Sequence, residues 1–309
     1  MTIQTIFQSR LLFVSGKGGV GKTSFAAAVA KASAERGKKV LLLEIDNIHP
    51  SLTSIFGTTP QYEPKNVGGT LSIANLTWQK ALEDWLIETV RVRTIAQTIL
   101  SNKVAMIFLD ATPGARELVM LSKILSLTSH WDQIVVDLPA SGHALGILRV
   151  PKTAQSLMKT GPIQEISSKI LALFSLPTTR VALVGLPEEM VINETIEFSQ
   201  KISKEIPQLQ EPIIVLNRTS TPSFSDSEHI VIKRLQKKSL HEQGFELLQA
   251  AIWEKDLESA SSAAINRLKQ TQSEELISFP RLGLLGGYDG GPQKVVQQMK
   301  AALLRRSLS

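Results

Sequence analysis

Residues 16–23, Gly16-Lys17-Gly18-Gly19-Val20-Gly21-Lys22-Thr23, match the phosphate-loop pattern G-x-x-x-x-G-K-[ST]. The apolar run 11–14 precedes them and predicts a buried strand, and the alanine-rich run 24–36 follows and predicts a helix. A glycine-rich loop between a strand and a helix presents backbone N–H groups and the positive end of the helix to a polyphosphate. This stretch therefore predicts a nucleotide-binding α/β fold. The alternative is a glycine turn with only a structural role.

The side chains of the loop predict how ATP or ADP and Mg²⁺ are held. We expect Lys22 to reach the β- and γ-phosphates and Thr23 to place its hydroxyl on Mg²⁺. The other predicted nucleotide contacts from this region are Gly18, Gly19, Val20, Gly21 and Ser24. A carboxylate for Mg²⁺ is expected at the end of a neighbouring strand, and Asp137 follows the apolar run 134–136. The alternative for Asp137 is a polar turn residue.

Short apolar runs alternate with helical patterns along the chain, which predicts a mostly parallel sheet covered by helices on both faces. The expected strands are 11–14, 40–45, 71–76, 133–138, 180–184, 212–216 and 276–279. The clearest helices are expected at 23–36, 188–205, 240–260 and 292–306. Residues 219–228 are rich in Ser and Thr, contain Pro222 and predict a loop.

Two further stretches have helical apolar spacing, at about 78–130 and 151–175. We interpret them as a helical subdomain inserted into a single P-loop ATPase domain that spans residues 1–309. A chain of this length is also long enough for two smaller domains.

The composition of the chain excludes some kinds of binding site and predicts a cellular compartment. The chain has no cysteine, which excludes disulfides and thiolate metal sites. Its 34 Lys and Arg against 28 Asp and Glu give a net charge of +6, but no basic run is interleaved with aromatic residues, so we expect no nucleic-acid partner. No run of about 18 apolar residues is present, and residues 1–9 lack the pattern of a signal peptide. We therefore expect a cytoplasmic protein.

The loop carries a second lysine, Lys17, which the phosphate-loop pattern does not require. With it, the loop resembles the deviant phosphate loop of a group that includes the arsenical-pump, tail-anchored-protein-targeting, division-site and partition ATPases. In that group the extra lysine marks ATP-dependent homodimers. The resemblance implies that Lys17 is catalytic and reaches a phosphate held by the facing subunit. The alternative is a solvated surface lysine.

Two segments resemble the nucleotide-sensing switches of the arsenical-pump-like branch. Asp46 and His49 match its Asp-Pro-x-His pattern, from which Asn47 departs by replacing the proline. The resemblance assigns Asp46 to orienting the attacking water, whereas the alternative is a helix cap. Asp137, followed by a turn of small residues and Gly142-His143, is similar to the second switch.

Three more segments, 112–117, 186–195 and 213–218, are similar to this branch, so that the resemblance spans roughly residues 11–285. It implies that the Asn217 side chain hydrogen-bonds the adenine edge, and that Arg218 and Pro280 belong to the adenine pocket. The chain departs from the targeting ATPases because it lacks their Cys-x-x-Cys zinc clamp and has only six methionines for a substrate groove.

These observations favour an Mg²⁺- and ATP-dependent ATPase whose dimer closes and opens to control a protein partner, such as a hydrophobic client. One alternative is a positioning ATPase on a membrane or nucleoid surface. It would use the basic, amphipathic segment 295–308, which we otherwise expect to pack as a closing helix. A second alternative is a nucleotide-sensing scaffold with little turnover.

Overall fold

The computed structural model describes residues 2–90, 98, 100–103, 107, 111–220, 224–235, 241–271, 276–281 and 291–307. Within them, eight strands form a sheet in the order β3-β4-β2-β5-β1-β6-β7-β8. The strands are β1 Leu11–Gly16, β2 Val40–Ile45, β3 Lys65–Gly68, β4 Leu71–Leu76, β5 Gln133–Asp137, β6 Thr179–Gly185, β7 Ile213–Thr219 and β8 Leu276–Pro280. All seven predicted strands are confirmed.

The sheet is parallel except at β3, which pairs antiparallel to β4. β3 was not predicted, because its four residues, Lys65–Gly68, include one apolar side chain, that of Val67, and so show no apolar alternation. The predicted fold class, a mostly parallel sheet covered by helices in the manner of P-loop NTPases, is confirmed.

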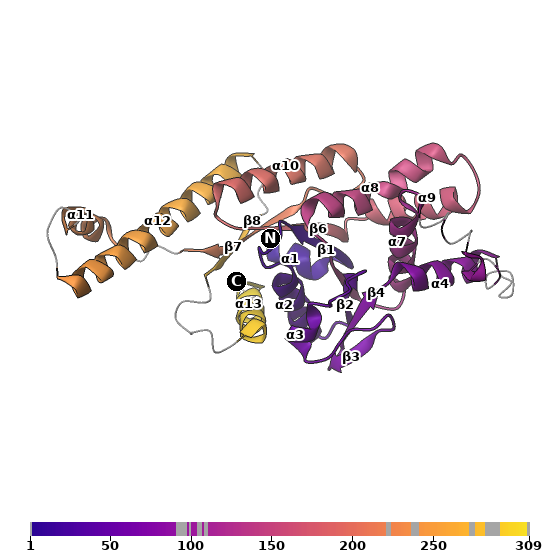
Figure 1. The fold of residues 1–309 in the computed structure, drawn as a ribbon, viewed down its shortest axis with the longest axis horizontal. Coiled ribbons are helices and arrows are strands. Elements are labelled where there is room, and N and C mark those ends of the chain that lie inside the picture. The colour runs from indigo at the N-terminus through magenta and orange to yellow at the C-terminus, as the bar shows by residue number, and fades with distance from the viewer. Residues whose placement is uncertain are drawn as a thin grey trace.

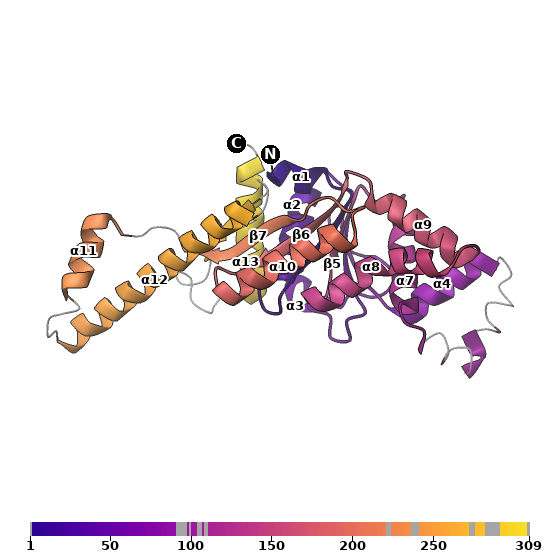
Figure 2. The same ribbon diagram turned by 90° about the horizontal axis from the view of Figure 1, so that it is seen from above.

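Helices cover both faces of the sheet (Figures 1 and 2). One face carries α1 Thr2–Gln8, α2 Lys22–Glu35, α3 Leu52–Phe56 and α13 Gly291–Ser307. The other carries α4 Trp78–Val90, α7 Ala115–Leu127, α8 Ser141–Leu157, α9 Pro162–Phe174, α10 Glu189–Glu205 and α12 Glu242–Thr271. The strands alternate between the two layers: in β1, Leu11 and Phe13 join one core and Leu12 and Val14 the other. This two-sided burial explains the nearly continuous apolar runs in the sequence.

Helices extend beyond the sheet at both ends of the molecule (Figure 1). At one end α4, α7, α8 and α9 pack against one another. At the other end α12 packs on α10 and β7, and α11, Asp226–Leu235, contacts α12 away from the sheet. That the first group forms a distinct subdomain stays a prediction, and much of its stretch 91–110 lies outside the described residues.

Three helix predictions need correction. The stretch predicted as helical from residue 151 contains two helices, and the first, α8, begins ten residues earlier at Ser141 and has Pro151 inside it. Ala144, Ile147, Leu148 and Pro151 are all buried on one side of α8, and this packing offsets the backbone hydrogen bond that the proline removes. Helix α11 begins within the predicted loop 219–228, and α12 runs eleven residues past its expected end.

The C-terminal helix packs as a closing element. Val296, Met299 and Leu303 of α13 are fully buried, mainly against α2 and α3, and Lys300 pairs with Glu35 of α2. The apolar side of this helix therefore lies in the core and is not presented to a membrane surface. Within the part of the chain that the structure describes, no helix is both long enough and apolar enough to cross a bilayer.

Candidate active site

The phosphate loop lies where the carboxyl ends of the parallel strands meet, the edge at which α/β sheets bind ligands. β1 ends at Gly16 and α2 begins at Lys22, so residues 17–21 form the turn between them. Gly21 is the N-cap of α2 and has a φ of 96°, a conformation that glycine adopts without strain. Gly18 and Gly19 are exposed, whereas Val20 is buried in the core beneath the loop. The loop thus turns the first N–H groups of α2 toward the site expected for phosphate.

Gly16 fixes the start of the loop through a close backbone approach. Its φ is 144°, and a Cβ atom at this position would lie 2.1 Å from the Val184 carbonyl oxygen of β6. We expect Gly16→Ala to lower the free energy of unfolding by about 2–4 kcal/mol, because both the backbone contact and the φ angle must change. Gly18→Ala is the matched control, since a Cβ there meets nothing within 4 Å. Urea unfolding that shows equal stability for both variants would contradict this account of the loop.

Lys22, Thr23 and Asp137 come together at this edge, as predicted. The Thr23 hydroxyl donates a hydrogen bond of 2.5 Å to Asp137 Oδ2 at the end of β5. Lys22 Nζ donates one of 3.0 Å to the Lys17 carbonyl oxygen, so the ammonium lies over its own loop. Burial lowers the pKa of Lys22, and the nearby Asp137 carboxylate opposes this shift. Ser24 follows in the first turn of α2.

Asp137 is a buried carboxylate beside the phosphate loop. Burial raises the pKa of Asp137 to about 7, with Glu44 adding to the shift and Thr23 and Lys22 opposing it. Its second oxygen, Oδ1, is buried and has no hydrogen-bond partner among the described residues. One hydroxyl and one carboxylate suit Mg²⁺, which in nucleotide sites takes its other ligands from phosphates and water. No cluster of three or more His, Asp or Glu occurs in the described ranges, so these residues offer no all-protein metal cage.

This buried carboxyl group predicts a pH dependence of stability in the absence of metal and nucleotide. The folded chain keeps the Asp137 proton up to about pH 7, whereas the unfolded chain loses it near the ordinary pKa of 3.8. The free energy of unfolding should therefore fall as the pH rises from about 4 to 7. Asp137→Asn cannot ionise, so we expect it to exceed the wild type by on the order of 2 kcal/mol at pH 8 and to match it near pH 4. Urea unfolding in EDTA at both pH values measures this, and parallel pH profiles would contradict it.

Strand β2 contains, next to its last residue, a buried carboxylate to which sequence reasoning gave no role. Glu44 is 2% exposed and accepts hydrogen bonds from the backbone N–H groups of Ser51 and Leu52 and from the Asn47 side chain. Burial raises the pKa of Glu44, and these hydrogen bonds oppose the shift. Glu44 thereby holds the N-terminus of α3 and shapes the loop 46–51. A lone carboxylate within the apolar run 40–45 was the signal that could have identified it.

Asp46 is exposed to solvent at the edge of the sheet where the strands end. It lies two residues after Glu44, which is in register with Asp137 of the neighbouring strand β5. Its φ is 45°, a conformation that costs a non-glycine residue free energy and is often found at functional sites. Its backbone N–H donates to the Leu76 carbonyl oxygen at 2.7 Å, and the Asn75 side chain donates to the Asn47 carbonyl oxygen at 2.7 Å. These contacts to β4 fix the backbone that carries the Asp46 carboxylate.

Asn217 contacts the phosphate loop directly. It is buried at the end of β7, and its Nδ2 donates a hydrogen bond of 2.9 Å to the Val20 carbonyl oxygen. Its Oδ1 accepts one from the backbone of Arg218, an exposed residue with a φ of 55°. An amide has two donor hydrogens and two acceptor lone pairs, so one of each remains for a base. Asn217 thus ties the end of β7 to the phosphate loop, a contact that the sequence did not predict.

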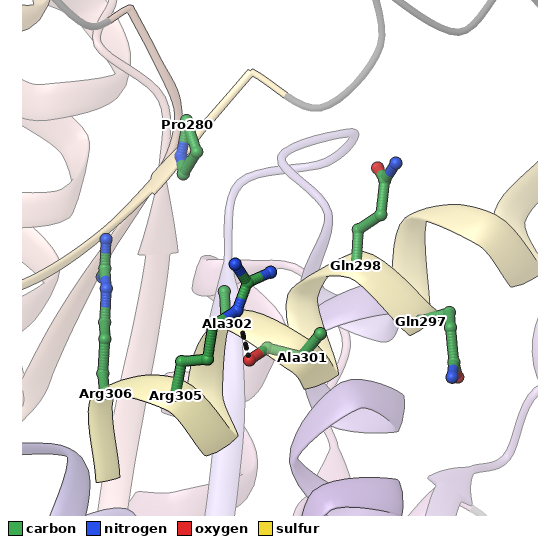
Figure 3. A pocket seen from close by; sticks show the side chains of 7 residues that line it. All are labelled: Pro280, Gln297, Gln298, Ala301, Ala302, Arg305 and Arg306. Carbon is green, nitrogen blue, oxygen red and sulfur yellow. Dashed lines mark hydrogen bonds between the residues drawn. The ribbon is translucent and has the colours of Figure 1, made fainter. Parts of the chain in front are cut away.

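Pro280 lies on the side of the sheet edge toward α13. It pairs in register with Thr219 of β7 and borders a cavity of about 550 Å³ beside the edge strand β8. Figure 3 shows the other lining side chains, which come from α13: Gln297, Gln298, Ala301, Ala302, Arg305 and Arg306. No residue of the phosphate loop lines this cavity. The role of Pro280 in an adenine pocket stays a prediction.

Lys17 forms an ion pair with a carboxylate of the same chain. Its ammonium lies 3.4 Å from Oε2 of Glu194 in α10, and both side chains are about two-fifths exposed, at 41% and 37%. Gly142 and His143 of the second switch segment are exposed in the first turn of α8, close in sequence to Asp137. Lys17 is therefore a partly exposed residue of the loop.

Comparison with known proteins shows which ATPases the chain resembles. The family model for anion-transporting ATPases matches residues 9–252. The chain is 28% identical to ATPase BagA of Mycobacterium tuberculosis over 225 residues, which are 68% of this chain and 65% of that protein. It is 29% identical to the ATPase ASNA1 homolog of Babesia bovis over 182 residues, 56% of this chain and 48% of that protein. A relative from Aquifex aeolicus, provisionally named an arsenical pump-driving ATPase, is 32% identical over 171 residues, 53% of this chain and 56% of that protein. The chain spans less than two thirds of the length of these curated relatives.

Proposed function

The chain belongs to the anion-transporting ATPase family, and from this premise we propose that it is an ATPase that depends on Mg²⁺ and acts as an ATP-bound homodimer. The observation that carries the proposal is the hydrogen bond of 2.5 Å between the Thr23 hydroxyl and Asp137, beside Lys22 at the N-terminus of α2. This combination supports the proposal, because a glycine-rich loop with a lysine suits a polyphosphate and a hydroxyl beside a carboxylate suits Mg²⁺.

In this proposal each residue has one task. The loop N–H groups and Lys22 bind the phosphates, and Thr23 and Asp137 hold Mg²⁺, which supplies charge neutralisation when bound. Asp46 accepts a hydrogen bond from the attacking water and orients it toward the γ-phosphate. Lys17 of the facing subunit stabilises the charge that develops on the transferred phosphoryl group. Asn217 hydrogen-bonds the adenine edge, and Arg218 and Pro280 flank the base.

We further propose that closing and opening of the dimer controls the binding of a protein partner, for which α4, α7, α8 and α9 are the candidate region. Leu157 and Met158, at the end of α8, are exposed apolar residues there, at 73% and 46%. Ile170 and Phe174 of α9 are buried instead and serve the core. The positioning alternative has less support, because the apolar side of α13 that it would use is buried in the core.

The test of the proposal is steady-state ATP hydrolysis by the unmodified protein, with Mg²⁺ and with EDTA. We expect turnover that requires Mg²⁺, and no ATP-dependent sedimentation with anionic vesicles or DNA. Tight ATP binding without turnover would contradict the proposal and favour the nucleotide-sensing scaffold. ATP-dependent sedimentation with vesicles or DNA would favour the positioning ATPase.

A further inference from the structure

Glu194 of α10 connects two parts of the candidate site. Its Oε1 accepts a hydrogen bond of 2.6 Å from the Ser141 hydroxyl, at the first residue of α8, and its Oε2 lies 3.4 Å from the Lys17 ammonium. One carboxylate therefore holds the extra lysine of the phosphate loop and the start of the helix that follows Asp137. Both of its oxygens are used within the same subunit.

We propose that Glu194 is a positioning residue, a latch that keeps Lys17 on its own subunit until a partner subunit with bound nucleotide draws the ammonium away. The inference rests on the proposed function, in which Lys17 acts on the nucleotide of the facing subunit. The lysine cannot reach across an interface while it stays 3.4 Å from Glu194, so the two contacts compete. This competition weakens dimerisation when the facing subunit has no bound nucleotide. Such a subunit offers no phosphate charge to draw Lys17 away from Glu194.

The contact with Ser141 connects the latch to the second switch segment. Ser141 is four residues beyond Asp137, and the intervening turn is held to β1 by a hydrogen bond of 3.0 Å from the Ser15 hydroxyl to the Pro139 carbonyl oxygen. Any displacement of the turn 138–140 therefore moves the Ser141 hydroxyl relative to the Glu194 carboxylate. Loss of this hydrogen bond frees the carboxylate and weakens its hold on Lys17. The latch can thus respond to a displacement of the turn that follows Asp137, the carboxylate proposed to hold Mg²⁺.

The expected effect of the latch on dimerisation depends on how exposed the Lys17–Glu194 ion pair is to solvent. A partly exposed ion pair contributes little, because water and salt screen it. A homodimer must open two latches, however, so the effects on dimerisation combine. We expect Glu194→Gln, which keeps an acceptor for Ser141 but removes the charge, to tighten the nucleotide-bound dimer about three- to tenfold at low salt. The difference should shrink in high salt.

The experiment is sedimentation equilibrium of the full chain with Mg²⁺ and the β,γ-imido analogue of ATP. The control is Glu197→Gln, which removes a carboxylate from the same helix that pairs with Lys201 instead. We expect a tighter dimer for Glu194→Gln and an unchanged one for Glu197→Gln. In a Lys17→Gln background, Glu194→Gln should have no effect. A Glu194→Gln dimer as weak as the wild type, or weaker, overturns the latch.

A second measurement separates failure of the latch from failure of the proposed function. The ¹⁵N signal of the Lys17 ammonium, identified by its loss in Lys17→Arg, can be followed in the nucleotide-free protein. We expect this signal to shift in Glu194→Gln and, by a smaller amount, in Ser141→Ala, but not in Glu197→Gln. If the wild type never dimerises, the proposed function fails, and an unshifted Lys17 signal in Glu194→Gln independently overturns the latch.

Discussion

Replacing Lys22 by alanine is expected to weaken ATP binding by about 10²–10³-fold, because the variant loses charge-assisted contacts to two phosphates. Among the described residues, the Lys22 ammonium donates a single hydrogen bond, of 3.0 Å to the Lys17 carbonyl oxygen, and burial lowers its pKa. Its removal therefore costs the fold little, and the loss should appear in affinity rather than in stability. Calorimetric titration with ATP and Mg²⁺ measures the affinity.

A matched control lies two turns further along the same helix. Lys31 is also a partly buried lysine of α2 whose pKa burial lowers, but it lies over the Phe56 ring, away from the loop. Lys31→Ala should bind ATP as the wild type does. Equal affinities for wild type, Lys22→Ala and Lys31→Ala would remove the phosphate assignment of the loop.

The second large effect concerns Lys17. We expect Lys17→Ala to bind ATP within a few-fold of the wild type but to lose about 10³–10⁵ in turnover, as in phosphoryl-transfer enzymes deprived of a cation supplied in trans. The two lysines have different surroundings, as separate effects on ATP binding and on turnover require. The Lys17 side chain points to Glu194, whereas Lys22 lies over the loop. Lys201→Ala, which removes an exposed lysine of α10 paired with Glu197, is the control and should keep full turnover.

Mixing two inactive variants tests whether the lysine acts across the interface. Lys17→Ala keeps an intact nucleotide site, and Lys22→Ala keeps the extra lysine. A mixed dimer contains one site with both lysines, so mixing should restore part of the turnover. Full turnover by Lys17→Ala alone would show instead that this residue is a solvated surface lysine.

The sequence predicted the parts of the site that follow one another along the chain. The strand, loop and helix around residues 11–36 are local, and the apolar runs marked every parallel strand because both faces of the sheet are covered. The position of Asp137 could be predicted from the strand that precedes it, because the carboxyl ends of parallel strands share one edge of the sheet.

What the sequence did not predict depends on tertiary contacts. The helical stretch predicted from residue 151 begins instead at Ser141, because packing on one side of α8 holds Pro151 inside a longer helix. β3 has no apolar pattern. α1 was missed because its seven residues are too few to repeat a helical period, although Ile3, Ile6 and Phe7 contact the core. The contacts of Glu194 with Lys17 and of Asn217 with Val20 join residues far apart in the chain, so no local pattern encodes them.

The most direct test of the central claim is the specific ATPase activity of the unmodified protein as a function of protein concentration, with saturating ATP and Mg²⁺ and with light scattering on the same samples. Because each active site takes Lys17 from a second subunit, the account predicts that activity per molecule rises with concentration and levels off where the scattering mass doubles. Constant activity per molecule across a range in which the protein stays monomeric would contradict it.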